Sequence, residues 1–283
     1  MKRTIVILAI CIFISLLMDF LSSAEEGPLT GILGASTEEI ILLEGQITGA
    51  REQYIEGIRF LIGEMEGRIV VLARTGVGKV NSAMVTTLLL EHFALSEVIV
   101  TGLAGGLNPD LFPGDIVIAQ RTAQHDLGSV TSDGLQNWGV RNPIDGTRNP
   151  IFFPADDRLL ALAETSGGRV EFEKIKIDGI ERSPQVLTGV VVTGDVFVSS
   201  SAKRLQLRQD LQADAVEMEG AAAAQICWQQ GVPCLVVRCL SDIADESADQ
   251  DYEAFYQVAA RNSTMLVTDL VEQLATGQSL ETE

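Results

Sequence analysis

The sequence predicts an α/β domain of three layers, in which a central mixed, mainly parallel sheet is flanked by helices. Short apolar runs alternate with amphipathic stretches of helical length, the order expected when helices pack on a sheet. The runs at 97–101 and 234–240 are apolar almost without a break, as strands buried on both faces are. With 46% hydrophobic residues among 283, the chain can fill one sizeable core. Because no repeat or linker divides it, we expect a single domain over 28–276.

In its first half the chain shows strand-like runs of apolar and β-branched residues, bounded by glycine, proline or charged positions. Val80, Met84 and Leu88 fall on one face of a helical pattern that begins at Lys79. The expected elements are a strand at 28–35, a helix from Glu38, strands at 54–62 and 68–74 with a turn at 63–67, a helix at 79–93, and strands at 97–101 and 115–119.

The second half begins with a stretch of different texture. Residues 124–155 are polar and aperiodic, carry three prolines, and predict a long surface loop or lid. Regular patterns then return as a helix at 156–166, a strand at 186–193, a helix at 202–211, a short strand at 213–216, a helix at 219–230, a strand at 234–240 and a long amphipathic helix at 251–274. We expect the tail at 277–283 to be frayed.

The first 24 residues have the three parts of a secretory signal. Lys2 and Arg3 precede an apolar run of fourteen residues at 5–18, and small residues at 22–24 suit a cleavage site. A permanent anchor is the weaker interpretation, because a spanning helix needs about 20 apolar residues. We therefore expect a signal peptide at 1–24, no stable membrane insertion after its cleavage, and a mature protein that is exported, either periplasmic or secreted.

The charge and the rare residue types narrow the possible partners. Asp and Glu number 39 against 20 Lys and Arg, for a net charge of −19. Such a chain repels phosphate backbones and anionic lipid, which argues against nucleic-acid binding. Only two histidines are present, and the cysteines at 227, 234 and 239 lack zinc-site spacing and lie in apolar patterns. No metal or organic cofactor is expected.

Two glycine-containing motifs follow predicted strands. Residues 73–79 resemble a phosphate loop, but the opening glycine is missing and Val80 replaces the Mg²⁺-binding hydroxyl residue, so we expect a tight turn that starts a helix. Residues 102–106 do not fit the dinucleotide fingerprint. Glycines at the end of a parallel strand still allow a ligand to approach the backbone closely.

Three carboxylates lie where predicted strands end. Glu39 follows the first strand, Glu219 lies at a strand–helix junction, and Asp242 lies just beyond 234–240. Each alone could serve a helix terminus. Together they predict a shared crevice, because the carboxyl ends of parallel strands meet at one edge of a sheet.

Seven segments in order resemble one family, the purine nucleoside phosphorylase/uridine phosphorylase superfamily, and within it the 5′-methylthioadenosine/S-adenosylhomocysteine nucleosidases. They span nearly all of residues 30–275. The segments are GILGA with Glu38 and Glu39, TGVGKV at 75–80, TGLAGGL at 101–107, PGDIV at 113–117, TGDVFV at 193–198, VEMEG at 216–220, and VVRCLSD at 236–242. The resemblance implies a nucleoside phosphorylase-like fold, a small-molecule nucleoside substrate and a homodimer.

The resemblance also implies hydrolysis of an N-glycosidic bond through an oxocarbenium-like ribosyl cation. Asp242 would protonate adenine N7 as general acid, Glu219 would hold the ribose hydroxyls, and Glu39 would act on the attacking water. Arg238 and Ser241 match positions near the water and the acid. The residues that would contact the substrate are Phe197, Val198, Met218, Ala104, Gly105 and Tyr252.

Three alternatives remain open, and one of them is a chain kept for structure or interaction, with the 128–155 loop as its contact surface. The other two are a phosphorylase and a binding protein of the same fold. A phosphorylase needs cationic or backbone donors around phosphate, whereas the chain has no basic residue between Glu39 and Arg51. Glu39 would repel a phosphate dianion, which favours water as the nucleophile. An exported protein that binds purine nucleosides without turnover is the second alternative.

The chain departs from the family pattern at one position of the glycine motif. Leu103 stands where many members of the family carry serine, which removes one polar contact near the sugar.

Overall fold

The computed structural model describes residues 28–177 and 179–278, so the predicted signal peptide lies outside the described residues. Its strands are β1 Leu29–Gly34, β2 Thr48–Ile55, β3 Ile58–Met65, β4 Arg68–Arg74, β5 Leu95–Val100, β6 Leu103–Gly106, β7 Ile116–Gln124, β8 Gly128–Thr131, β9 Gly134–Asn137, β10 Phe152–Pro154, β11 Ile175–Ile177, β12 Ile180–Arg182, β13 Val186–Thr193, β14 Ala215–Glu217 and β15 Cys234–Asp242. Its helices are α2 Thr37–Glu44, α3 Lys79–His92, α4 Asp157–Arg169, α5 Ser201–Leu211, α6 Gly220–Gln230 and α7 Ala248–Gln278.

A mixed sheet of eleven strands forms the middle layer, in the order β10-β7-β13-β14-β6-β15-β5-β1-β4-β3-β2. Its central pairings, β15 with β5, β5 with β1 and β1 with β4, are parallel. An additional antiparallel pairing of β7 with β15 closes the strands from β7 to β15 into a ring. The predicted fold class is confirmed.

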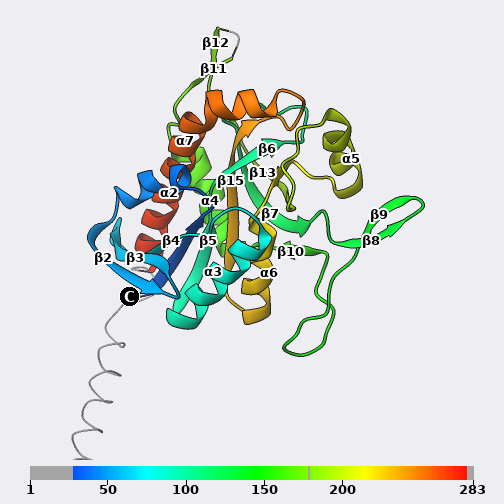
Figure 1. Ribbon diagram of the computed structural model, residues 1–283. Helices are drawn as coiled ribbons and strands as arrows, with labels where there is room; N and C mark the ends of the chain where they lie inside the picture. The colour runs from blue at the N-terminus through cyan, green and yellow to red at the C-terminus, as the bar shows by residue number, and fades with distance from the viewer. Residues whose placement is uncertain (1–27, 178, 279–283) are drawn as a thin grey trace, which may run out of the picture.

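Helices cover both faces of this sheet (Figure 1). Neighbouring residues of one strand point to opposite faces: Leu33 packs in a cluster with Val85 and Leu89 of α3, whereas Ile32 packs with Leu266 of α7. All nine residues of β15 are buried. This alternation produces the three predicted layers, since each face of a buried strand meets its own helices.

The strand expected at 54–62 is wrong, because a two-residue turn at Glu56 and Gly57 divides it. Both residues have positive φ, 49° and 80°, which is the geometry of a tight hairpin turn. A second turn of this kind at Glu66 and Gly67, with φ of 49° and 77°, replaces the longer turn expected at 63–67. The strands β2, β3 and β4 therefore form an antiparallel meander.

The region expected to be a loop at 124–155 contains short strands. It holds the β8–β9 hairpin, which extends away from the body in Figure 1, and the edge strand β10, which pairs with β7 in the main sheet. Helix α7 begins three residues before the predicted start and continues to Gln278; the remaining expected tail, 279–283, lies outside the described residues. Within the described ranges, no helix is long and apolar enough to span a membrane.

Candidate active site

A cavity of about 330 Å³ brings the three predicted acids together. Glu39 enters from the first turn of α2, Glu219 from the junction of β14 and α6, and Asp242 from the end of β15. The lining consists of Ala35, Ser36, Glu39, Val77, Leu103, Ala104, Gly105, Phe197, Val216, Glu217, Met218, Glu219, Ser241, Asp242, Asp249 and Tyr252.

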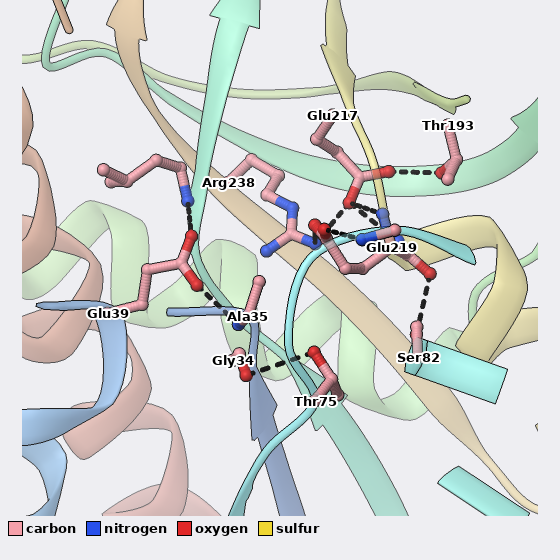
Figure 2. Close-up of polar contacts among 12 residues, drawn as sticks. Gly34, Ala35, Glu39, Thr75, Ser82, Thr193, Glu217, Glu219 and Arg238 are labelled. Carbon is pink, nitrogen blue, oxygen red and sulfur yellow. Dashed lines mark hydrogen bonds and ion pairs between the residues drawn. The ribbon is translucent and has the colours of Figure 1, made fainter. Parts of the chain in front are cut away.

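Backbone amides fix the carboxylate of Glu39 (Figure 2). Its Oε2 accepts hydrogen bonds from the N–H groups of Ala35, at 2.5 Å, and Ser36, at 2.7 Å. Its Oε1 accepts from the N–H of Leu103 at 3.1 Å. The bond to Ser36 is one half of a capping box at the start of α2. The hydrogen bonds at the start of α2, together with the Leu103 N–H, therefore fix the orientation of this carboxylate in the cavity wall.

Glu219 is held by a turn far away in sequence. The Gly78 N–H donates to its Oε1 at 2.8 Å, and the Ser82 hydroxyl donates to its carbonyl oxygen at 3.1 Å. Burial, followed by the nearby carboxylate of Glu217, raises the pKa of Glu219 to about 7. The turn expected at 73–79 thus exists. It also supplies the Gly78 N–H as a hydrogen-bond donor to the site, and a backbone donor cannot be predicted from a pattern of side chains.

Arg238 and Glu217 form a buried ion pair behind the cavity. The Glu217 carboxylate also accepts from the Thr193 hydroxyl and from the N–H groups of Glu219, at 3.0 Å, and Gly220, at 2.7 Å. Nη2 of Arg238 lies 3.7 Å from Oε2 of Glu219. Glu217 is therefore the organising residue that sequence reasoning missed, although it lies two positions before Glu219.

Gly102 allows Arg238 and Glu39 to approach the same point of the backbone. A Cβ at this position would collide with Arg238 Nη1 and with Glu39 Oε1. Among the described residues, Arg238 Nη1 has no hydrogen-bond partner. A carboxylate oxygen and a guanidinium donor thus converge beside the cavity, an arrangement able to orient a small polar molecule.

Asp242 is 2% exposed. Its Oδ1 accepts from the Ala244 N–H at 2.8 Å, and its Oδ2 accepts from the Ser241 hydroxyl at 2.8 Å. Burial raises its pKa above the usual range, although these two hydrogen bonds act in the opposite direction. A carboxyl group in this setting is suited to carry a proton toward neutral pH.

Most of the remaining predicted residues line the same cavity. Phe197, Met218, Ala104, Gly105, Tyr252 and Ser241 are part of the wall. Val198 lies instead in a small adjoining cavity of about 30 Å³, which shares Phe197, Met218 and Asp242 with the larger one. Ser36, Val77 and Asp249 also line the larger cavity; we did not predict them, because each comes from a turn or helix start whose direction only the fold sets.

The lining is rich in acidic groups. It includes the carboxyl groups of Glu39, Glu217, Glu219, Asp242 and Asp249, and it contains no lysine, arginine or histidine among the described residues. The pKa values of Glu219 and Asp242 are raised, so these two groups do not add full negative charges at neutral pH. The nearby guanidinium of Arg238 is already paired with Glu217. Such a site favours developing positive charge and disfavours an anion.

Comparison with known proteins agrees with this geometry. A family model described as the phosphorylase superfamily matches residues 30–272. A protein from Anoxybacillus flavithermus named 5′-methylthioadenosine/S-adenosylhomocysteine nucleosidase is 40% identical over 244 residues, which cover 86% of this chain and 97% of that protein.

Solved structures agree as well. The nucleosidase of that name from Neisseria meningitidis, in complex with methylthio-immucillin-A, is 34% identical with a TM-score of 0.75, covering 87% of this chain and 100% of that one. A futalosine hydrolase from Helicobacter pylori is 31% identical with a TM-score of 0.73, covering 87% of this chain and 98% of that one. The chain therefore belongs to the phosphorylase superfamily and, within it, to the 5′-methylthioadenosine/S-adenosylhomocysteine nucleosidase family.

Proposed function

We propose that this protein hydrolyses the N-glycosidic bond of adenine nucleosides, such as 5′-methylthioadenosine and S-adenosylhomocysteine, and releases adenine. The observation that carries the proposal is the meeting of Glu39, Glu219 and Asp242 in one cavity, whose wall has no basic side chain within the described part of the chain. Cleavage develops positive charge on the ribose, and an anionic wall stabilises that charge.

Asp242 acts as the general acid on adenine. Burial raises its pKa, which favours the form that carries a proton, and the Ser241 hydroxyl and the Ala244 N–H fix the direction of its two oxygens. Protonation of N7 makes adenine a better leaving group, because the electrons of the broken bond end on a neutral base. Phe197 stacks on the base, and Val198 contacts it through the adjoining small cavity.

Glu219 binds the ribose hydroxyls, and Met218 packs below the sugar. The Gly78 N–H uses only one oxygen of Glu219, so further lone pairs remain to accept from two O–H donors. Ala104 and Gly105 bring backbone close to the substrate, while Tyr252 lies toward the 5′ substituent.

Glu39 activates the attacking water, oriented together with Nη1 of Arg238. Glu39 Oε1 and Arg238 Nη1 both lie close to the point that a Cβ of residue 102 would occupy, so that together they offer a water molecule one acceptor and one donor. A phosphate dianion at this point would meet the carboxylate of Glu39 in a low-dielectric site at a cost of several kcal/mol. Water is therefore the nucleophile, and phosphorolysis is disfavoured.

The test is a product assay on the purified protein. We would incubate it with methylthioadenosine, S-adenosylhomocysteine, adenosine, inosine and futalosine in phosphate-free buffer, and then repeat each reaction with phosphate. Free adenine without added phosphate supports the proposal. Strict dependence on phosphate with formation of a ribose 1-phosphate would assign the protein to the phosphorylases, and binding without turnover to the non-catalytic alternative.

We also propose a homodimer, supported by the family and by exposed apolar side chains. Val80 and Met84 on α3 are 79% and 46% exposed, and Trp138 in the loop after β9 is 40% exposed. Large apolar side chains left exposed on one molecule are available for an interface with a second copy. Light scattering on the eluting protein should give twice the mass of one chain, and a monomeric mass would contradict this proposal.

Export is the third proposal, and it rests on the pattern of the first 24 residues. An exported nucleosidase would act on nucleosides outside the cytoplasm. Fractionation of cells that express the full chain, with sequencing of the N-terminus of the product, tests it. An intact Met1 on cytoplasmic protein would overturn it.

A further inference from the structure

One side chain joins two backbone segments that form parts of the cavity wall. The segment 75–79, which follows β4 and includes the first residue of α3, contributes Val77 to the lining, and the segment 194–197, after β13, contributes Phe197. The Asp195 carboxylate connects them, because its Oδ1 accepts from the N–H of Lys79 at 2.8 Å. Asp195 itself does not line the cavity.

Consecutive amides of the 75–79 turn serve two carboxylates. The Gly78 N–H donates to Glu219 Oε1 at 2.8 Å, and the next N–H, of Lys79, donates to Asp195 at the same distance. Gly78 has φ of 97°, and a Cβ there would lie 3.1 Å from Asp195 Oδ1. Since the two donors are adjacent on one chain, a shift of the turn away from Asp195 would also move the donor that holds Glu219.

Asp195 is held in place by two further contacts. Its own N–H donates to Asp126 Oδ2 at 2.9 Å. Lys79 Nζ donates to Asp126 Oδ1 at 2.6 Å and lies 3.9 Å from Asp195 Oδ2. Lys79, Asp126 and Asp195 thus form a closed ring of contacts, which we call the Lys79–Asp126–Asp195 ring.

The start of α3 depends on this ring. Its N-cap is Gly78, which has no side chain to cap the helix, and no acidic residue lies in the first turn. Asp195 therefore supplies, from another segment, the negative charge that the N-terminal end of a helix favours. The Asp195 carboxylate therefore stabilises both the first turn of α3 and the turn that precedes it.

We propose that Asp195 is a positioning residue for substrate binding. It holds the 75–79 turn against the 194–197 segment, keeps the Gly78 N–H on Glu219, and keeps Phe197 in place beside Asp242. The expected change in KM rests on the proposed function, because it requires turnover. The expected change in Kd for the nucleoside does not. The side chain of Asp195 is 48% exposed, so its replacement should weaken substrate binding far more than it weakens the fold.

The test compares Asp195→Ala with Asp195→Asn. Alanine removes the acceptor for the Lys79 N–H, and we expect KM for methylthioadenosine to rise about tenfold, as for the loss of one hydrogen bond to a charged group, with kcat within about threefold of wild type. Asparagine keeps an acceptor oxygen and should restore most of the affinity. Asp210→Ala, which removes an exposed charge on α5 that lines no part of the cavity, is the control and should match wild type.

A KM for Asp195→Ala within twofold of wild type would overturn the proposal. So would a lower kcat at unchanged KM, because that pattern reports only a smaller folded fraction. If Asp195→Ala does not fold, Asp126→Asn takes its place and should raise KM in the same direction. If the wild type releases no adenine, the proposed function fails by itself, and calorimetric Kd values for methylthioadenosine then decide the positioning role.

Discussion

Arg238 Nη2 lies 3.7 Å from Oε2 of Glu219, yet the pKa of Glu219 is raised to about 7. The reason is that Glu217 already holds the guanidinium, so burial and the second carboxylate outweigh the attraction of Arg238. The site therefore keeps Glu219, the acid that we propose binds the sugar, close to its titration point at neutral pH. This relationship determines two of the predictions below.

Activity should rise with pH on the acidic side. In the proposed function Glu219 is ionised when it accepts from both ribose hydroxyls, and its raised pKa of about 7 means that acid converts it to the neutral form. We expect kcat/KM for methylthioadenosine to fall about tenfold per pH unit well below 7. For Glu219→Gln, kcat/KM should be much lower than for wild type, and it should no longer fall as the pH is lowered. A wild-type profile that is flat from pH 5 to 8 would contradict the assignment.

The free energy of unfolding should also depend on Glu219, but it should fall as pH rises, whereas activity should rise. Because the folded pKa of Glu219, about 7, exceeds its ordinary 4.5, the native state binds a proton that the unfolded state does not. Its contribution to stability is complete below about pH 4.5 and is lost as pH rises through about 7. In thermal melts, Tm of Glu219→Gln relative to wild type should increase from pH 5 to pH 8. A difference that stays constant or shrinks would count against this prediction.

Replacement of the proposed acid should remove most of the catalysis. Asp242→Asn keeps the shape and the acceptor oxygen but cannot donate the proton to N7, so kcat should fall by about 10² or more. Release of adenine can be followed by its absorbance change. Asp210→Asn on α5 serves as a control for the loss of one charge. Near-wild-type turnover by Asp242→Asn would remove this residue from the mechanism.

Glu39→Gln tests the activation of water. The Glu39 carboxylate accepts three backbone N–H groups, and an amide can neither satisfy all three nor act as a base. We expect kcat to fall by about 10². Glu38→Gln is the matched control, since Glu38 is exposed and adjacent, and it should stay within twofold of wild type. Equal effects of the two changes would show that Glu39 has no special role.

Glu217 should matter for stability as well as for the site. Glu217→Ala removes the nearer ion-pair partner of the fully buried Arg238 and leaves it only Glu219, 3.7 Å away. Breaking a buried ion pair typically costs about 3–5 kcal/mol. Urea denaturation measures this loss. Glu173→Ala breaks the pair with Arg261 at the surface and should cost less than about 1 kcal/mol. Losses of similar size for the two variants would argue against a structural role of the buried pair.

The layered architecture could be predicted because apolar runs report burial directly. The division of 54–62 could not, because Glu56 adopts a positive φ that its residue type does not indicate. The three acids were predictable as residues at strand ends, and the cavity contains all of them; their catalytic roles stay predictions. Gly78 acts through its backbone N–H and Glu217 through a partner 21 positions away, so neither contribution is visible in local sequence.

The pairing of β7 with β15 has a consequence for solubility. Because it closes the strands from β7 to β15 into a ring, the open sides of the sheet are β2 and β10. Strand β10 has three residues and ends in Pro154, while β2 exposes charged Arg51 and Glu52. Proline and charge at such positions oppose strand addition from another molecule. Concentrated protein should therefore resist cross-β fibre growth for as long as it stays folded.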